Sequence, residues 1–286
     1  MSDQVTKRLP GRPKFSLRDH GPQNVFTRFR LHHGLIFSLI RREIESRYRG
    51  SILGIGWSLI VPATMLVVYT FVFTVIFKAR WNLKMEGPAE FALLLFSGLI
   101  VFQFFSECIT RSPTLMLENI PYIKRVVFPL EVLGMVSIGT ALINVFLSSS
   151  ILMIGYVFIR GIPPLTAFFF PIVFLPFALM VLGLVWFFSS IGVYLQDLKQ
   201  FIGSVIPLFL FLSPVFYPIE ALPERFLFYI YLNPLTFIIE QMRSVLFYGE
   251  MPNFLGLLLY TVLALFIAWM GFLWFSLTKY GFSDVV

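Results

Sequence analysis

Residues Val132–Ile159 read VLGMVSIGTALINVFLSSSILMIGYVFI and contain no charged side chain. A helix needs only about 20 consecutive apolar residues to cross the hydrocarbon core of a bilayer, which is roughly 30 Å thick. A stretch of this length and composition is therefore typical of a transmembrane helix. It sets the fold class, and other parts of the chain repeat the pattern.

Five further stretches are apolar enough to cross a membrane. Prolines 163 and 164 would break a helix that continued past the first stretch, so the next span is expected to start near Ala167. The other expected spans are Trp57–Phe77, Phe91 to about Thr110, Gln200–Ile219 and Phe254–Leu277. Residues Phe226–Ile239 are apolar but too short to cross, and are expected to be re-entrant or interfacial. The sequence thus predicts an all-α integral membrane protein with six transmembrane helices.

The composition excludes a water-soluble protein. Of the 286 residues, 58% are hydrophobic, 18% are aromatic and 13% are charged, whereas soluble domains carry roughly a quarter of charged residues. The single cysteine, Cys108, cannot form an intrachain disulfide, and the three histidines, His20, His32 and His33, all precede the first span. We therefore expect neither a disulfide framework nor a metal site.

The distribution of lysine and arginine predicts the orientation. Eleven of the 22 basic residues precede the first span, and the loop at Lys124-Arg125 and the tail at Lys279 fall on the same side. Because cytoplasmic loops are enriched in basic residues, both termini are expected in the cytoplasm. Three basic residues of the first outer loop oppose this bias, offset by Glu86 and Glu90: Lys78, Arg80 and Lys84.

The sequence lacks the residues that several classes of protein function require. No G-x-x-x-x-G-K-[ST] phosphate-binding loop occurs, so any ATP must be hydrolysed by a partner. The four aspartates are too far apart for the Asp-x-Asp pair of a metal-dependent glycosyltransferase: Asp3, Asp19, Asp197 and Asp284. The span centres carry no ionisable residue, which disfavours proton-coupled or ion-coupled transport. What remains is a pathway driven from elsewhere or a purely structural membrane protein.

The residues ahead of the first span predict an interfacial helix over residues 33–50. They follow a basic tail, residues 1–32, which lacks the apolar core of a signal peptide and is expected to be retained. Apolar residues repeat every four positions on one face, with charged residues opposite: Ile36, Ile40, Ile44 and Tyr48 against Arg41, Arg42, Glu45 and Arg49. Glu43 with Arg47, and Glu45 with Arg49, have favourable i,i+4 spacing.

This helix admits two interpretations, a membrane-surface anchor or a docking platform for a cytoplasmic motor. It leads into the membrane domain, residues 51–286. Gly50, Gly54 and Ser58 follow the helix at a spacing of four, and small residues at this spacing favour close packing of the first span on a neighbour.

The stretch RREIESRYRGSILGIGWSLIVPATMLVVYTFVFTVIF, residues 41–77, resembles the start of the permease subunits of polysaccharide-exporting ATP-binding-cassette transporters. These are the O-antigen and capsule exporter permeases. The residues that carry the resemblance are Arg41, Arg42, Glu43, Arg47, Tyr48, Arg49, Ser51, Leu53, Gly54, Trp57 and Pro62. Similar pieces recur at residues 96–105, 117–131, 194–200 and 232–247. Gln196-Asp197 departs from the family, in which an Arg-Asp pair is common.

The resemblance implies an ATP-driven exporter. The chain would form a homodimer with two copies of a separate ATPase that binds ATP and Mg²⁺, and would itself carry no cofactor. The expected cargo is a lipid-linked polysaccharide, with O-antigen favoured, and the expected location is the bacterial cytoplasmic membrane; no nucleic acid is expected as a partner. The alternatives are an exporter of teichoic acid, lipid or drug and, in a different class, an integral membrane acyl- or glycosyltransferase.

The resemblance also assigns candidate residues. Prolines 121 and 129 bracket a short cytoplasmic element, which is either a positive-inside loop or a second contact with the ATPase. The candidates for coupling to the ATPase are Arg41, Arg42, Glu43, Arg47, Arg49, Tyr122, Lys124, Arg125 and Asp197. Aromatic rings suit a sliding sugar chain, and the candidates for the translocation path in the first and fifth spans are Tyr69, Phe73, Phe209, Phe216 and Tyr217.

Four prolines after the fifth span, at positions 214, 218, 223 and 234, prevent one continuous helix. Two short helices that return to the outer face fit better, and the family resemblance implies that they form a re-entrant gate region at about residues 220–250. Its candidate residues are Asn233, Pro234, Glu240 and Arg243. Glu240 and Arg243 lie one turn apart, so they either pair with each other or take part in gating.

Overall fold

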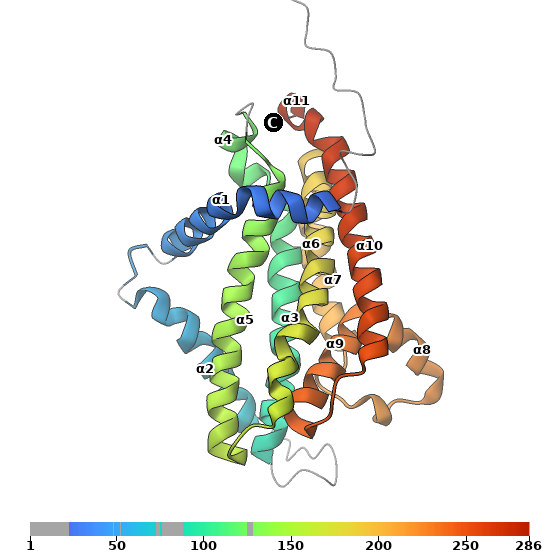
Figure 1. Ribbon diagram of the computed structural model, residues 1–286. Helices are drawn as coiled ribbons and strands as arrows, with labels where there is room; N and C mark the ends of the chain where they lie inside the picture. Colours follow the sequence, from blue (N-terminus) through green and yellow to red (C-terminus); the bar gives the residue numbers. More distant parts are fainter. Residues whose placement is uncertain are drawn as a thin grey trace, which may run out of the picture.

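The computed structural model describes residues 23–47, 49–51, 53–72, 75, 88–124 and 128–285, and within these ranges the regular structure is helical throughout. Long helices run side by side as a bundle, and α1 lies across one end of it (Figure 1). The all-α prediction is confirmed.

Among the described residues, four helices are long and apolar enough to cross a membrane. They are α3 (Pro88–Arg111), α5 (Glu131–Arg160), α6 (Phe170–Tyr194) and α10 (Phe254–Thr278). Two apolar helices are shorter, α2 (Trp57–Phe71) and α7 (Leu198–Leu212), with 15 residues each. At 1.5 Å per residue, 15 residues reach roughly 22 Å, less than the full hydrocarbon thickness. All six expected spans therefore contain a helix, and four of these helices have the full length within the described residues.

The fifth expected span ends earlier than predicted. We expected it to reach Ile219, but α7 stops at Leu212, and Ser213 is extended with φ −94° and ψ 147°. The reason is Pro214, because a residue that precedes proline is pushed away from the helical region. The predicted end of the first span, Phe77, lies outside the described residues.

Two short helices connect α7 to α10, as predicted from the prolines. They are α8 (Glu224–Leu232) and α9 (Pro234–Arg243). A five-residue π-helix, η8 (Ser244–Tyr248), continues α9 and ends at Gly249, which has φ +66°. The remaining short elements are η2 (Gly54–Gly56), η4 (Ser112–Thr114), η5 (Leu117–Asn119), α4 (Ile120–Ile123), η6 (Leu165–Phe169), η7 (Ile219–Ala221), η9 (Lys279–Gly281) and α11 (Phe282–Val285).

The helix α3 is the centre of the bundle. It packs against α2, α5, α6, α7 and α9, and the side chains of Leu93, Leu94 and Leu95 are fully buried. The closest helix pair is α6 with α10, where a Cβ atom on Gly271 would collide with the carbonyl oxygen of Gly183. Such close approach of small residues is a main source of helix association in membranes, where apolar burial gives little gain.

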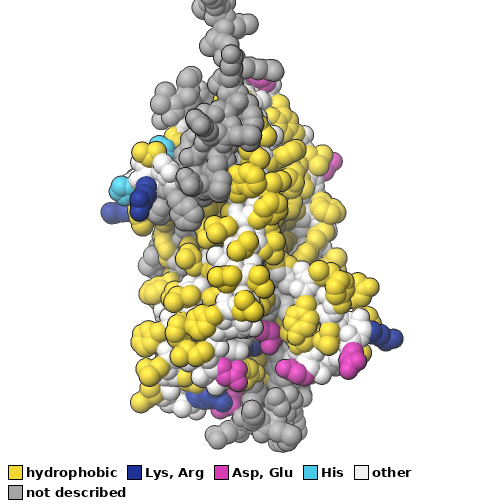
Figure 2. All heavy atoms as spheres, turned by 45° about the vertical axis from the view of Figure 1, so that its right-hand side comes forward, with side chains coloured by type: hydrophobic (Ala, Val, Ile, Leu, Met, Phe, Trp, Pro, Cys, Tyr) yellow, Lys and Arg dark blue, Asp and Glu magenta, His cyan; other side chains and the backbone are white. Residues whose placement is uncertain are grey.

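The two ends of the bundle carry different elements. The helix α1 (Gln23–Arg47), α4 and α11 lie at one end, which we call the α1 end, whereas α9 and the start of α10 lie toward the opposite end (Figure 1). On the face seen in Figure 2, hydrophobic side chains cover the side of the bundle, and the charged side chains lie toward its ends. Large apolar side chains are widely exposed there and elsewhere, such as Phe158 at 85%. This surface requires an apolar solvent.

The N-terminal helix starts ten residues earlier than the predicted position 33, at Gln23. Pro22 directly precedes it, and no glycine or proline interrupts residues 23–33. After the helix ends at Arg47, Gly50 and Gly54 have φ values of +83° and +54°. A Cβ atom at either glycine would meet no described atom within 4 Å. These glycines serve the turns of the connection, and the described residues show no close packing at Gly50 or Gly54.

Candidate coupling site, pathway and gate

The apolar face of α1 is packed onto the bundle as its sequence pattern predicts. Ile36 and Ile40 are 2% and 9% exposed, and α1 contacts α5. Gly139 of α5 makes room for Ile40, because a Cβ atom at that position would collide with the Ile40 Cδ1 atom. The helix α1 therefore packs on α5 in a defined position.

The opposite face of α1 carries exposed charges. Arg41 donates from Nε to Glu45 Oε1 at 2.8 Å, and this hydrogen bond raises the pKa of the Arg41 guanidinium. The expected pair of Glu45 with Arg49 is wrong, because the helix ends at Arg47 and Glu45 pairs one turn earlier instead. Arg49 lies beyond the helix and is exposed.

Four charged residues join α1 to α3. Glu43 forms an ion pair with Arg111, and Arg47 donates from Nη1 to Glu107 Oε1 at 3.0 Å. Glu43 and Arg47 also face each other at 3.9 Å, as their spacing predicted. Glu43 and Arg47 were expected to face an ATPase, but the structure turns both side chains toward the membrane helix α3.

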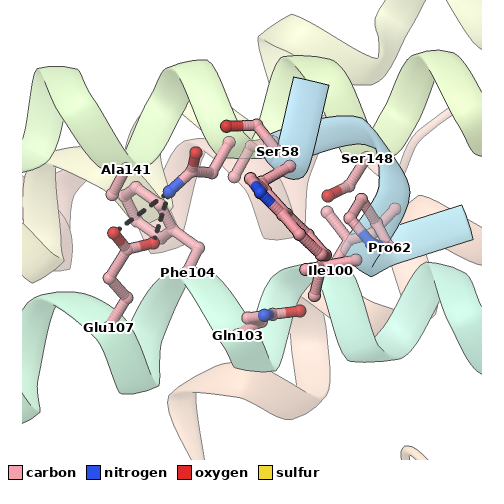
Figure 3. Close-up of a pocket in the computed structure, with 12 residues that line it drawn as sticks. Ser58, Pro62, Ile100, Gln103, Phe104, Glu107, Ala141 and Ser148 are labelled. Carbon is pink, nitrogen blue, oxygen red and sulfur yellow. Dashed lines mark hydrogen bonds between the residues drawn. The ribbon is translucent and has the colours of Figure 1, made fainter. Parts of the chain in front are cut away.

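The carboxylate of Glu107 is also bound from α5. Asn144 Nδ2 lies 3.0 Å from Glu107 Oε1 and 2.9 Å from Oε2. Both contacts are visible as dashed lines from Glu107 in Figure 3. They lie beside a cavity of about 220 Å³ between α2, α3 and α5. Its lining includes Gln103, Ser58 and Ser148 besides Glu107, so polar groups reach into a bundle that is otherwise apolar.

The element between α3 and α5 stands next to α1. Tyr122 of α4 accepts a hydrogen bond from Arg42 Nη1 at 3.0 Å and stacks on Phe128 with ring centroids 4.4 Å apart. A polar cleft of about 450 Å³ lies between α1 and this element, lined in part by Arg42, Arg111 and Tyr122. Lys124, directly after α4, is exposed. Arg125 lies outside the described residues.

Asp197 precedes α7 in the turn that follows α6. Its side chain is exposed and does not cap the helix, while its carbonyl oxygen accepts from the Phe201 amide at 3.1 Å. Tyr194, near the end of α6, donates to the carbonyl oxygen of Thr278 at 3.1 Å. This contact joins the ends of α6 and α10 near α11, so Asp197 belongs to the α1 end.

Within one chain, the described candidates for the pathway lie on or next to two separate helices, α2 and α7. Tyr69 of α2 is partly buried, and Phe209 of α7 packs on Phe105 with centroids 5.9 Å apart. Phe216 and Tyr217 were expected in the fifth span but lie after the end of α7, where Tyr217 donates to the Phe211 carbonyl oxygen at 3.1 Å. The helices α2 and α7 each pack on α3 rather than forming one wall. Phe73 lies outside the described residues.

The predicted gate residues hold the short helices in place. Asn233 caps α9 by accepting from the Leu235 amide at 3.0 Å, and it donates to Ser213 Oγ at 2.9 Å. Pro234 is the first residue of α9, and its carbonyl oxygen accepts from Tyr260 of α10 at 3.1 Å. The loop after α7 and the start of α10 are thus both tied to the start of α9.

The pairing of Glu240 with Arg243 is present, with 3.2 Å between Oε1 and Nη1. Arg243 is only 1% exposed and also donates from Nη2 to the Val215 carbonyl oxygen at 3.0 Å. Its guanidinium lies against Gly98 of α3, where a Cβ atom would be 3.2 Å from Nη2. Arg243 therefore binds three parts of the chain together.

Two further ion pairs were missed by sequence reasoning. Glu131 and Lys279 lie 3.3 Å apart near the α1 end, and Glu90 and Arg160 lie 2.9 Å apart near the opposite end. Arg160 also donates to the Phe247 carbonyl oxygen at 2.8 Å, which joins α5 to η8. A signal existed, because each residue flanks an apolar stretch and the predicted topology places the two members of each pair at the same end. Asn144, which lies inside the apolar stretch Val132–Ile159, had no comparable signal.

These features together define an integral membrane protein built as a helical bundle with an amphipathic helix docked across one end. The chain belongs to the family of ABC-2 type transporter membrane proteins, whose model matches residues 34–247. The match begins within α1, includes α4, α8 and α9, and ends within η8, ahead of α10.

Individual relatives are similar over most of their length. The chain is 24% identical over 257 residues to the O-antigen export system permease protein RfbA of Myxococcus xanthus, covering 89% of this chain and 96% of that protein. It is 25% identical over 259 residues to the protein of the same name from Klebsiella pneumoniae, covering 88% and 96%. It is 23% identical over 247 residues to the polysialic acid transport protein KpsM of Escherichia coli, covering 84% and 92%.

Proposed function

We propose that this chain is the permease subunit of an ATP-driven exporter that moves a lipid-linked polysaccharide across the bacterial cytoplasmic membrane. The observation that carries the proposal is the similarity, over 84% to 89% of the chain, to permease and transport proteins named for O-antigen and polysialic acid. O-antigen is favoured as the cargo because the two permeases named for it match slightly more of the chain. ATP and Mg²⁺ would bind to a separate ATPase subunit.

The α1 end is proposed to face the cytoplasm. It carries Arg41, Arg42 and Lys124, and cytoplasmic segments are enriched in basic residues. Both the start of α1 and the C-terminal helix α11 lie there (Figure 1), which requires an even number of crossings. In this proposal α2 and α7 belong to the fifth and sixth crossings.

A homodimer is proposed because α2 and α7 are incompletely covered. None of the described side chains of α2 is buried, and Phe201, Leu208 and Phe211 of α7 are 65%, 59% and 68% exposed. A twofold axis next to these helices would place α2 of one subunit near α7 of its partner. The aromatic residues predicted for the path, which one chain keeps apart, would then line one conduit.

The exposed charges of α1 and the α4 element are proposed to bind the ATPase, two copies of which would serve the dimer. Arg41, Arg42 and Lys124 are exposed at the same end, and Arg42 lines the polar cleft. Charged rims of this kind set orientation and association rate in protein complexes. Arg49, Asp197 and Arg125 are assigned a role in ATPase binding on the basis of the family resemblance.

The proposal is tested by deleting the gene in its native host. The expected result is loss of surface polysaccharide, with lipid-linked glycan accumulating at the cytoplasmic face, and recovery when the wild-type gene is restored. Co-purification of an ATPase with the tagged chain in detergent, at one ATPase per permease, would support the subunit arrangement. Transferase turnover by the purified chain without any ATPase would contradict it and favour the enzyme alternative.

Capsular polysaccharide is the second candidate cargo, favoured by the similarity to KpsM. The deletion distinguishes the two, because surface glycan attached to lipopolysaccharide is lost in one case and capsule in the other. An unchanged glycan surface with altered lipid or drug resistance would point instead to the remaining exporter alternatives.

A further inference from the structure

The four charges between α1 and α3 form a matched set, which we call the charge quartet: Glu43, Arg47, Glu107 and Arg111. Glu43 and Arg47 lie one turn apart on α1, and Glu107 and Arg111 lie one turn apart on α3. The order of the signs allows each residue to meet an opposite charge across the contact, Glu43 with Arg111 and Arg47 with Glu107. If either helix were shifted by one turn, two like charges would face each other across the contact.

The quartet is partly removed from water. The exposed fractions of its side chains are 19% for Glu43, 34% for Arg47, 26% for Glu107 and 27% for Arg111. Charges in such surroundings are screened less by salt than charges in open solvent, so their attraction constrains the helices more strongly. By contrast, the Arg41 and Glu45 side chains on the outer face of α1 are 83% and 60% exposed.

The contact extends to a third helix. Asn144 of α5 binds both carboxylate oxygens of Glu107, and Gly139 of the same helix receives Ile40 from α1. Glu107 is thus the residue at which α1, α3 and α5 meet, at the edge of the cavity in Figure 3.

The helix α3, which the quartet binds to α1, also contacts the predicted gate region. Further along α3, Gly98 lies against Arg243 of α9, whose charge is matched by Glu240. A continuous set of packed elements therefore runs from α1 through α3 to α9.

Resting on the proposed function, we infer that the quartet makes α1 and α3 move as one body, so that displacement of α1 by the ATPase is delivered to α3 and from there to α9. The four residues are positioning residues, which act through α3 and do not touch the cargo. Asn144 adds α5 to this body. If α1 were only a surface anchor, its contacts with α3 could loosen without effect on export.

The first test compares charge reversals. Glu107→Arg and Arg47→Glu, each alone, should lower export per ATP hydrolysed at least tenfold, while the ATPase still co-purifies and hydrolyses ATP. The double variant Arg47→Glu/Glu107→Arg restores opposite charges and should recover at least half of the wild-type ratio. Glu250→Arg, a reversal at an exposed loop position before α10, is the matched control and should leave the ratio unchanged.

A covalent link provides the second test, which does not depend on tolerance of a reversed charge. Arg47→Cys and Glu107→Cys are combined in a Cys108→Ser background and joined by a short thiol-specific bifunctional cross-linker. Since the inference holds that α1 and α3 move together, the linked protein should retain at least half of wild-type export.

Loss of export on linking, with ATP hydrolysis intact, would overturn the inference, as would wild-type export per ATP in both single reversals. Failure of the proposed function looks different. In that case the wild-type protein itself would show neither a co-purified ATPase nor ATP-dependent export.

Discussion

Arg243 of α9 donates from Nη2 to the backbone carbonyl oxygen of Val215, 3.0 Å away, although α8 separates the two residues in the sequence. Val215 lies in the connection after α7, where Pro214 and Pro218 prevent a helix. Lipid offers no hydrogen-bond donor to such a carbonyl group, so non-helical backbone inside a membrane protein needs partners from the protein. Arg243 provides one, and Glu240 matches its charge.

We expect Arg243→Leu to destabilise the protein by roughly 3–5 kcal/mol, because it removes the counter-charge of Glu240 and the donor to Val215 in one step. The measurement is the thermal unfolding midpoint of the purified protein in detergent. Arg225→Leu is the control, because Arg225 is exposed on α8 and its loss should cost no more than roughly 0.5 kcal/mol. Equal shifts of the midpoint in the two variants would refute the bridging role.

Gly271→Ala should weaken the packing of α6 on α10. The added methyl group collides with the Gly183 carbonyl, which belongs to the backbone and cannot rotate away as a side chain could. Overpacking of this kind costs about 1–3 kcal/mol. The readout is the fraction of monodisperse protein in size-exclusion chromatography after heating.

Gly203→Ala is the matched control for the packing prediction. Gly203 lies within α7, and a Cβ atom there meets no described atom within 4 Å. Alanine favours helix over glycine by up to about 1 kcal/mol, so this variant should be neutral or more stable. A loss of stability at Gly203 equal to that at Gly271 would show that close approach is not the cause.

The membrane helices could be predicted because their signal is local. An uncharged apolar run such as Val132–Ile159 by itself predicts a membrane-spanning helix, and α5 extends over Glu131–Arg160. The signal for the two short helices was also local, because prolines limit where a helix can begin and end. The end of α7 was misplaced because hydrophobicity was weighed above Pro214, although the backbone restriction before a proline acts at that point.

Partner choice could not be predicted in the same way. The i,i+4 spacing alone predicted that Glu45 pairs with Arg49. In the structure the helix ends at Arg47, and Glu45 pairs with Arg41 instead. Glu43 and Arg47 were visible as charges on α1, while their partners on α3 depend on how two helices 60 to 68 residues apart are seated. The sequence thus showed that α1 carries these charges, whereas their division into inward and outward charges required the structure.

The pair of Glu131 with Lys279 should stabilise the bundle near the α1 end. The Glu131 side chain is fully buried, and Lys279 lies 3.3 Å from its Oε2 atom. Lys279→Met should cost roughly 3–5 kcal/mol, because it removes a counter-charge from a buried carboxylate. Glu131→Gln/Lys279→Met should cost less than the sum of the two single changes. Thermal unfolding of the four proteins gives the coupling energy, and additive losses would contradict a direct interaction.

The outward charges of the α1 end are expected to bind the ATPase. Two double charge reversals test this, Arg41→Glu/Arg42→Glu and, separately, Lys124→Glu/Arg125→Glu. Each should lower the amount of co-purified ATPase by roughly tenfold or more, because the new acidic side chains would repel an acidic surface on the ATPase that complements the basic one. Membrane insertion should not change, since these residues lie outside the apolar spans. Tyr122→Phe separates two effects of Arg42: it removes the hydrogen bond from Arg42 to Tyr122 and leaves every charge in place, so it should retain ATPase binding. If both double reversals keep full ATPase binding and normal surface polysaccharide, these side chains act only as orientation signals and α1 is a membrane anchor.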